Sequence, residues 1–345
     1  MKKLIVSTLL ITSITGTYYS ATPAEAASRC VDQNTKLVKL PNFKSKTTLT
    51  QMKKGQFVFK GYKYADSYSK ALRSFGQPGE ITVERASYGT LGQMNYGDFT
   101  VVMYSKNRNE KLQNLKGQEM IFEVGVKSKI SQGTIEQSLG KSTRTDMTTK
   151  STKFLSYGKH TAVSYKKVKG VWIAQEIHYG IESSTSEYKS STGKLTKLKT
   201  KPLSSKDLKA MTQKKYQISG VKLGASPASV KKLVGYSNHE LNTLIPVHQA
   251  LVQAYGDMDW VEMYYEAPKC DEQYRLTNIL FDYSNMKVPF SSIEKVLGKA
   301  KKVETTSYMD GKTKVNQKTY YYKNIEVHTE VVGKKYMVNS VIYGS

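Results

Sequence analysis

The feature that most constrains the fold of this chain is a short helical motif that ends in glycine and occurs four times. The motif ends at Gly76, Gly140, Gly235 and Gly298, and apolar residues stand five and one positions before each glycine. The spacing is paired, because 159 residues separate Gly76 from Gly235 and 158 separate Gly140 from Gly298. Repeats of this kind set the architecture of a chain, so we expect a two-unit module that has been duplicated whole.

Each motif carries the signals of a short helix followed by strands. Ser67 (or Asp66), Ser131 and Ser226 suit the N-cap position, whereas Pro289 stands there in the fourth copy. The closing glycine suits a left-handed turn after the helix. The expected strands are 81–86, 99–104, 119–124, 154–157, 161–166, 171–179, 260–265, 276–283, 319–323, 325–332 and 336–343.

These patterns predict an α+β protein of four repeat units arranged as two pairs. Each unit is expected to hold a short helix or helical hairpin and a three- to four-stranded antiparallel sheet, with helices covering one face of the strands. The first two-unit domain spans 57–180 and the second 218–345. Between them, 181–217 is predicted to be a Lys/Ser/Thr-rich linker with a helical turn from Asp207 to Met211.

The N-terminus reads as a secretory signal. Lys2 and Lys3 precede an apolar run from Leu4 to Ile14, and Ala24–Ala26 is an A-x-A cleavage site. The apolar run is too short for a spanning helix, which needs about 20 residues. We therefore expect a signal peptide at 1–26, cleavage near Ala26, a poorly organised lead-in at 27–56, and a mature protein that is secreted or cell-wall associated, with no transmembrane segment.

The chain contains two cysteines, Cys30 and Cys270. In an exported protein an even number of cysteines favours a disulfide, and this one would join the mature N-terminus to the second half. The alternative is a pair of unpaired thiols.

The charge of the chain bears on its partners. The formal net charge is +25, and loss of Lys2, Lys3 and Glu25 with the signal peptide leaves +24. Such a charge favours polyanions, and outside a cell these are nucleic acid, anionic cell-wall polymer or an anionic membrane surface. The alternative is a lysine-rich protein that is merely soluble or adheres loosely to the wall.

Interleaved Tyr and Lys residues favour the same class of ligand. Aromatic rings stack on bases or sugars, while lysines neutralise phosphates without reading sequence. Tyrosine also suits half-buried strands for purely structural reasons. The candidate polyanion-binding residues are Lys60, Lys63, Tyr64, Lys166, Lys167, Lys197, Lys199, Lys201, Lys214, Lys215 and Lys323.

The last unit resembles a known family. Ser291–Lys299 reads SSIEKVLGK, Thr319–Tyr322 reads TYYY and Val338–Gly344 reads VNSVIYG, and a second copy of this pattern lies at Thr134–Lys141 and Trp172–Gly180. The order resembles the immunodominant staphylococcal antigen B family, doubled in tandem. The resemblance implies a secreted surface protein with sequence-independent nucleic-acid binding and no catalytic residues. The paired units are also similar to the secreted β-lactamase-inhibitor protein, whose two units jointly form a protein-binding sheet.

No motif in the sequence predicts catalysis, a cofactor or a metal. Gly140–Thr143 (GKST) lacks the earlier glycine of a phosphate-binding loop, and no histidine pair has a metal-binding spacing. One acidic group (Asp257, Asp259, Glu262, Glu266, Asp271 and Glu272) matches no calcium loop and is expected to be a solvated surface. We therefore predict a non-enzymatic binding protein for polyanions; the alternative is a protein-binding module or inhibitor of a secreted enzyme.

Overall fold

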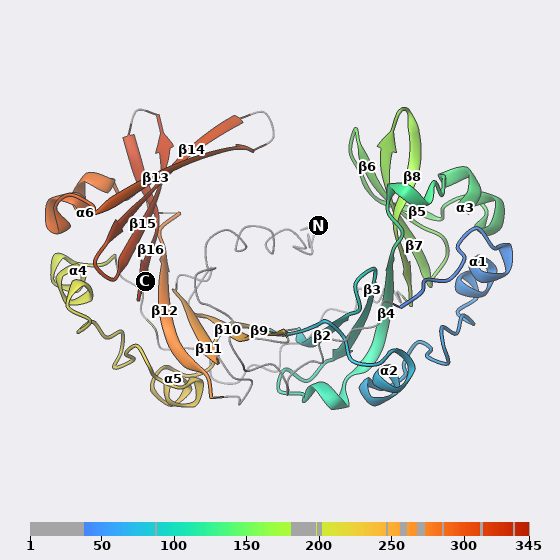
Figure 1. Cartoon of the computed structure of the whole chain (residues 1–345), viewed down its shortest axis with the longest axis horizontal. Helices are drawn as coiled ribbons and strands as arrows, with labels where there is room; N and C mark the ends of the chain where they lie inside the picture. Colours follow the sequence, from blue (N-terminus) through green and yellow to red (C-terminus); the bar gives the residue numbers. More distant parts are fainter. Residues whose placement is uncertain are drawn as a thin grey trace.

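The protein is one long antiparallel sheet with helices on one of its faces (Figure 1). The computed structural model describes residues 38–86, 88–180, 198, 202–245, 248–255, 261–267, 273–284, 286–310, 313–333 and 335–344. Within these residues a single sheet contains sixteen strands, so the predicted α+β class is confirmed.

The first half of the chain contains α1, α2 and α3 with β1 to β8, and two 3₁₀ turns. Their bounds are α1 (Lys46–Lys53), α2 (Tyr68–Phe75), β1 (Glu80–Ala86), β2 (Gly89–Asn95), β3 (Phe99–Ser105), η1 (Leu112–Asn114), β4 (Lys116–Glu123), η2 (Val126–Ser128), α3 (Gln132–Leu139), β5 (Arg144–Thr148), β6 (Thr152–Ser156), β7 (Thr161–Val168) and β8 (Val171–Tyr179).

The second half contains α4, α5 and α6 with β9 to β16. Their bounds are α4 (Ser205–Thr212), α5 (Pro227–Val234), β9 (His239–Ile245), β10 (His248–Tyr255), β11 (Val261–Ala267), β12 (Arg275–Asp282), α6 (Phe290–Leu297), β13 (Lys302–Asp310), β14 (Thr313–Tyr322), β15 (Ile325–Val332) and β16 (Lys335–Tyr343). None of the described helices is long and apolar enough to cross a membrane.

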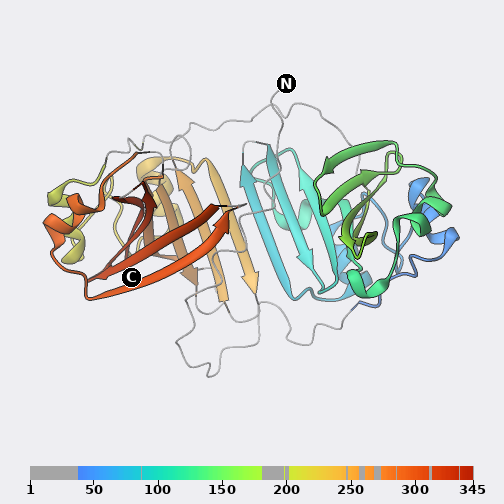
Figure 2. The ribbon, with the colours of Figure 1, turned by 90° about the horizontal axis from the view of Figure 1, so that it is seen from above.

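The two halves join through one strand pair, β1 with β9. These strands run antiparallel from Ile81 opposite Leu244 to Arg85 opposite Glu240, with Val83 opposite Asn242 in the middle. Outward from this pair the order is β1-β2-β3-β4-β8-β7-β6-β5 on one side and β9-β10-β11-β12-β16-β15-β14-β13 on the other. The sheet is therefore continuous through the junction, as the view from above shows (Figure 2).

The sheet is curved into an open crescent. All six described α-helices lie on its outer, convex side, and the two ends of the sheet rise as the arms of the crescent (Figure 1). Between the two arms lies one broad concave face on which none of the described helices lies (Figure 1). The fold thus presents two different surfaces, one made of helices and one made of strands.

The serine caps and glycine stops predicted for the four motifs are present. The side chains of Ser67, Ser131 and Ser226 accept hydrogen bonds from the backbone N–H three residues later, whereas Pro289 provides no side-chain cap. Gly76 has φ 83° and ψ −161°, and the other three closing glycines share this conformation. Because this region is almost restricted to glycine, it explains the repeated residue; the predicted left-handed helical conformation was wrong in ψ.

Each half has its own apolar core between its helices and the convex face of the sheet. In the first half, Phe59 packs edge-on against Phe99 and Phe122, with ring centroids 5.2 and 5.5 Å apart. In the second half the core is built around buried Tyr265, Ile279 and Tyr343. Buried aromatic rings contribute strongly to the hydrophobic stabilisation of each half.

Helix α1 corrects the prediction of a poorly organised lead-in. Ser45 caps the helix, and Leu49 and Met52 are fully buried against the first core. Helix α1 packs on α3, and α4 packs on α6 in the other half. Helix α4 likewise extends the expected turn at 207–211 into a complete helix with a capping box at Ser204.

All the predicted strands overlap observed strands, but β2, β5, β9, β10 and β13 were missed. Strand β5 is exposed along its whole length, so it lacks the alternation of apolar and polar residues that marks a strand. On β9 and β10 the helix-facing positions include Glu240 and Gln253. Polar residues therefore stand where an alternating pattern would have apolar ones, and the strands cannot be recognised from that pattern. The signal peptide, Cys30, Cys270, Lys197, Lys199, Lys201, Asp257, Asp259, Asp271 and Glu272 lie outside the described residues.

We expect Leu49→Ala to destabilise the first half by about 2–5 kcal/mol, because it removes a fully buried leucine and leaves a cavity. Chemical denaturation followed by near-ultraviolet circular dichroism measures this. The control is Gln51→Ala on the exposed side of the same helix, for which we expect a change within about 0.5 kcal/mol. Equal stability of the two variants would show that α1 does not contribute to the core.

Candidate functional site on the concave face

The concave face is made of the strand residues that alternate with the core residues. Phe122 and Ile177 pack in the core, so their neighbours Ile121, Glu123, Glu176 and His178 point to the opposite face. The same alternation, shifted where β-bulges occur, places residues of the other paired strands on this face. The face therefore extends over a width that neither half has by itself.

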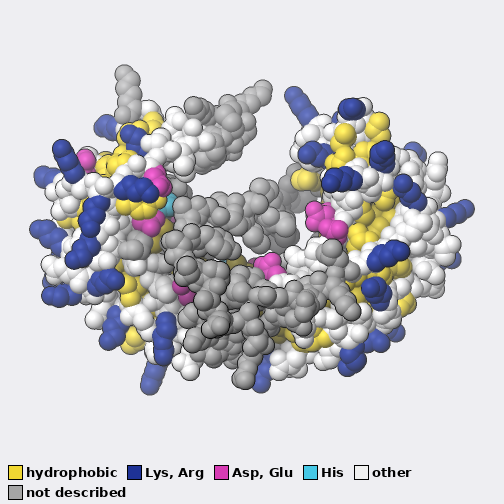
Figure 3. Space-filling model, in the orientation of Figure 1, with side chains coloured by type: hydrophobic (Ala, Val, Ile, Leu, Met, Phe, Trp, Pro, Cys, Tyr) yellow, Lys and Arg dark blue, Asp and Glu magenta, His cyan; other side chains and the backbone are white. Residues whose placement is uncertain are grey.

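Acidic side chains are concentrated on the concave face. They come from the central strands of both halves and from the junction, and the space-filling view shows them along the inner side of the crescent (Figure 3). The acidic residues that alternation and strand register place on this face are Glu80, Glu84, Glu119, Glu123, Glu176, Glu262, Glu266, Asp282, Glu304 and Glu326.

Lysines occupy the outer surface instead. The helices that cover the convex side carry many exposed lysines, and Lys and Arg side chains project outward in the space-filling view (Figure 3). The exposed helix lysines are Lys46, Lys53, Lys206, Lys209, Lys231, Lys232 and Lys295. The convex side is thus rich in lysine, whereas the acids are concentrated on the concave face, which Lys116, Lys166, Arg275 and Lys302 share by strand register.

The most highly connected group on the concave face is His178 on β8. Its Nδ1 lies 2.6 Å from Oε1 of Glu119 on β4, and its Nε2 lies 3.2 Å from Oε2 of Glu176. The ring of Phe154 packs edge-on at 5.0 Å, and the Ser164 hydroxyl donates a hydrogen bond to Glu176. Two carboxylates therefore hold the imidazole between them.

Burial opposes the charge of His178, but the hydrogen bonds and charges of Glu119 and Glu176 outweigh it and raise its pKa to about 9. The same hydrogen bond and charge from His178 lower the pKa of Glu176 against its own burial. His178 is consequently an imidazolium at neutral pH. A protonated histidine between two carboxylates stabilises the sheet and is not poised to act as a general base.

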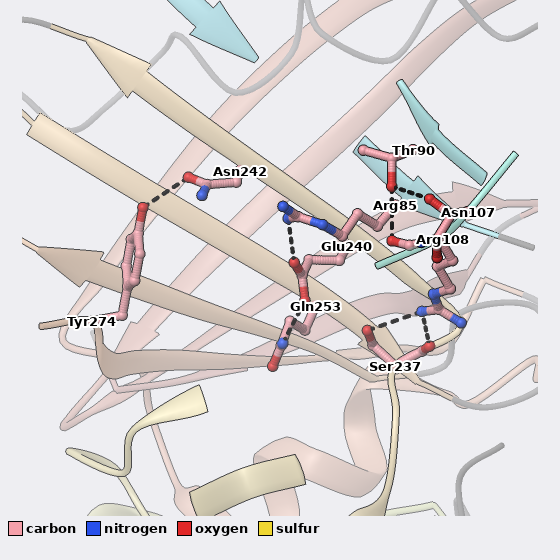
Figure 4. A network of polar contacts seen from close by, with 9 residues as sticks. All are labelled: Arg85, Thr90, Asn107, Arg108, Ser237, Glu240, Asn242, Gln253 and Tyr274. Carbon is pink, nitrogen blue, oxygen red and sulfur yellow. Dashed lines mark hydrogen bonds and ion pairs between the residues drawn. The ribbon is translucent and has the colours of Figure 1, made fainter. Parts of the chain in front are cut away.

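Polar contacts join the two halves on both faces of the junction. On the concave face, Nε2 of His239 lies 2.9 Å from Oε1 of Glu84. On the convex face, Arg85 pairs with Glu240 at 2.9 Å, and Arg108 donates to the Ser237 carbonyl (Figure 4). Arg108 is only 7% exposed, so it is a buried connection between the halves.

The residues predicted to bind polyanions are distributed over several elements. Lys60 and Lys63 are exposed at the turn before α2, while Lys214 and Lys215 are exposed after α4 and Lys323 in the turn between β14 and β15. Tyr64 is different, because it packs against the first core. The structure thus places these lysines on both halves and does not gather them around Tyr64.

Lys166 and Lys167 are exposed on β7 and point to opposite faces. Lys167 lies over the ring of Trp172 at 5.5 Å, and Lys153 lies over the same ring at 4.3 Å. This Lys153–Trp172–Lys167 group was not predicted as a unit. Its signal in the sequence was a tryptophan beside basic strand residues, but only the pairing of β6, β7 and β8 brings the three together.

The acidic concave face was not predicted either. Glu262 and Glu266 belong to the acidic group that the sequence marks as a solvated surface, but the other acids of this face come from strands far apart in the chain, which only the strand pairing brings onto one surface. No group of three or more His, Cys, Asp or Glu residues within the described ranges could hold a metal ion. Comparison with protein-family models, curated proteins and solved structures finds no match to this chain.

We expect His178 to make stability depend on pH. Its pKa is about 9 in the folded protein against the ordinary 6.5, so the folded protein binds this proton more tightly than the unfolded chain does. The resulting stabilisation, up to about 3 kcal/mol, is complete below pH 6.5 and is lost as the pH rises through 9. Denaturation midpoints of the protein and of His178→Gln across this range measure it.

Between pH 6.5 and pH 9, His178→Gln should lose less stability than the parent protein. An NMR titration of the imidazole gives a second reading, and Glu119→Gln should move its midpoint toward the ordinary histidine value. An imidazole titration midpoint that is unchanged in Glu119→Gln would contradict the assignment of the raised pKa to Glu119.

Proposed function

We propose that this chain is an exported, non-catalytic binding protein whose lysine-rich outer surface associates with polyanions, either extracellular nucleic acid or an anionic cell-wall polymer. The observation that carries the proposal is the concentration of exposed lysines on the helix-covered outer surface (Figure 3). Lysines spread over a convex surface suit a flexible polymer, because counterion release needs many phosphate contacts and no fixed geometry.

The proposal has support from the sequence as well. The net charge of +25 is built mostly from lysine, and base-specific readout favours arginine. The resemblance to the staphylococcal antigen B family implies the same kind of ligand. The predicted signal peptide would deliver the protein to the compartment where such polymers are found.

Binding to a mixed-sequence DNA duplex and to teichoic acid should weaken steeply with salt. We expect the quadruple variant Lys60→Gln, Lys63→Gln, Lys214→Gln, Lys215→Gln to bind more weakly at low salt. Its salt dependence should also be shallower, by about 0.9 in log–log slope for each duplex phosphate that is no longer neutralised. Fluorescence anisotropy over a range of salt concentrations measures both quantities.

The matched control neutralises four exposed or half-buried acids of the concave face, Glu80, Glu123, Glu262 and Glu266, to glutamine. This control should bind the polyanions as tightly as the parent protein or more tightly. Failure of both polymers to bind at low salt, or binding that is insensitive to salt, would refute the proposal.

A second candidate function is favoured by the concave face itself. A broad, acid-lined sheet fits a convex partner protein with a basic surface, because complementary charge steers association and selects the partner. This corresponds to the predicted alternative of a protein-binding module or inhibitor of a secreted enzyme. The two functions use opposite surfaces, so they do not compete.

Charge reversal at Glu123 and Glu266, both exposed, separates the two functions. With lysozyme as a cationic probe, we expect Glu123→Lys, Glu266→Lys to weaken binding at least about tenfold and to leave DNA binding intact. Lysozyme binding that is unchanged in this variant would exclude the concave face as its site.

We also infer that the fold arose by duplication of a two-unit module, as the sequence predicts. Supporting this, α1 and α2 begin 159 residues before α4 and α5, and α3 begins 158 residues before α6. The tight turn that pairs Phe59 with Tyr62 recurs where Ile218 pairs with Val221.

A further inference from the structure

The second half contains a pocket of about 610 Å³ on its convex side, at the N-terminal end of α5. Its walls come from α5, from the helix-facing side of β9 and β10, and from the start of β12. This volume falls within the range of small-molecule binding sites. The pocket lies on the opposite face from the acid-lined concave surface, so neither function proposed above involves it.

The floor of the pocket is polar although it lies where a core would be expected. Gln249 and Gln253 are only 5% and 6% exposed. Gln253 Nε2 donates to Glu240 at 2.8 Å, its Oε1 accepts from the Tyr255 hydroxyl at 2.9 Å, and Glu240 pairs with Arg85 (Figure 4). Buried polar groups are costly unless such partners fix them, and these contacts join Gln253, Tyr255, Glu240 and Arg85 into one connected network.

A second polar contact closes the pocket on the side of β12. The Tyr274 hydroxyl donates a hydrogen bond of 2.7 Å to Oδ1 of Asn242 across the strands (Figure 4). This bond fixes the half-buried tyrosine beside the pocket. The amide of Asn242 and the network around Gln253 thus reach the pocket from neighbouring strands.

The first half fills the corresponding place with apolar side chains. At the positions 159 residues before Glu240, Asn242, Gln253 and Tyr274, it has Ile81, Val83, Met94 and Leu115, all buried. Leu115 and Leu112 lie 2.8 and 3.0 Å from where a Cβ on Gly92 would stand. The first half thus shows that packing at the positions of Asn242, Gln253 and Tyr274 does not require polar residues. Glu240 also serves the junction through Arg85, and Thr90, at the position that corresponds to Gln249, is itself polar and buried.

We propose that this pocket binds an uncharged saccharide of one or two sugar rings. The amides of Asn242, Gln249 and Gln253 and the hydroxyls of Ser226 and Tyr274 line the pocket, and groups of these kinds both donate and accept, as a polyhydroxylated ligand requires. The one carboxylate at the floor, Glu240, is already paired with Arg85, so the pocket does not favour a cation. The Tyr274 ring adds an aromatic surface beside these polar groups.

The test uses the mature full-length protein with two probes, N,N′-diacetylchitobiose and cellobiose. We expect saturation-transfer NMR to detect binding of at least one probe at about 10 mM or below, as befits a weak site. The blocking variant Ala228→Trp places a large side chain at an exposed lining position, and should weaken binding at least about tenfold. Its matched control is Ser69→Trp, at the same position of α2, which should bind as the parent protein does.

A second variant tests the polar floor without a bulky side chain. Asn242→Val with Gln253→Met introduces the residues that the first half has at these positions, so we expect it to fold, as circular dichroism can verify, and to lose sugar binding. Binding of neither probe, or binding that survives both Ala228→Trp and the double variant, would overturn the proposal.

Discussion

The antiparallel pairing of β1 with β9 is the interaction on which the rest of the structure depends. Without it the chain would hold two separate eight-stranded sheets, each with an unpaired edge of backbone N–H and C=O groups. The five paired positions from Ile81 to Arg85 satisfy that edge internally. The antiparallel pairing centres on Val83 and Asn242. The two halves therefore lie on opposite sides of the junction, and both curve toward the same face of the sheet.

This junction also decides where function can reside. It makes the concave face continuous across both halves and puts all the described helices on the other side (Figure 1). The acids of the two halves thereby share one surface, and the lysines of the helices another. A single pairing of strands thus gives a basic chain one lysine-rich helical surface and one strand surface on which its acids gather.

The elements that the sequence predicts best are those whose signals are local. Serine caps, the apolar positions of the four glycine-ended helices and the alternating core strands all appear within a few residues of one another. Helix α1 carries only a weak signal of this kind: Ser45 caps it, but Leu49 and Met52 are the only buried residues in a lysine- and threonine-rich segment. Its stability comes from α3 and the first core, and tertiary packing of this kind is not visible in local sequence.

The sequence by itself determined the α+β class, the four glycine-ended helices, the paired spacing and the strong positive charge. Only the tertiary structure decided that the strands form one sheet, that the acids converge on its concave face, and that Glu119, Glu176 and His178 meet. It also decided that Asn242, Gln253 and Tyr274 line one pocket. Strand order and register bring together residues that are far apart in the chain. Both depend on which strand edges pair, and no local pattern of residues specifies that pairing.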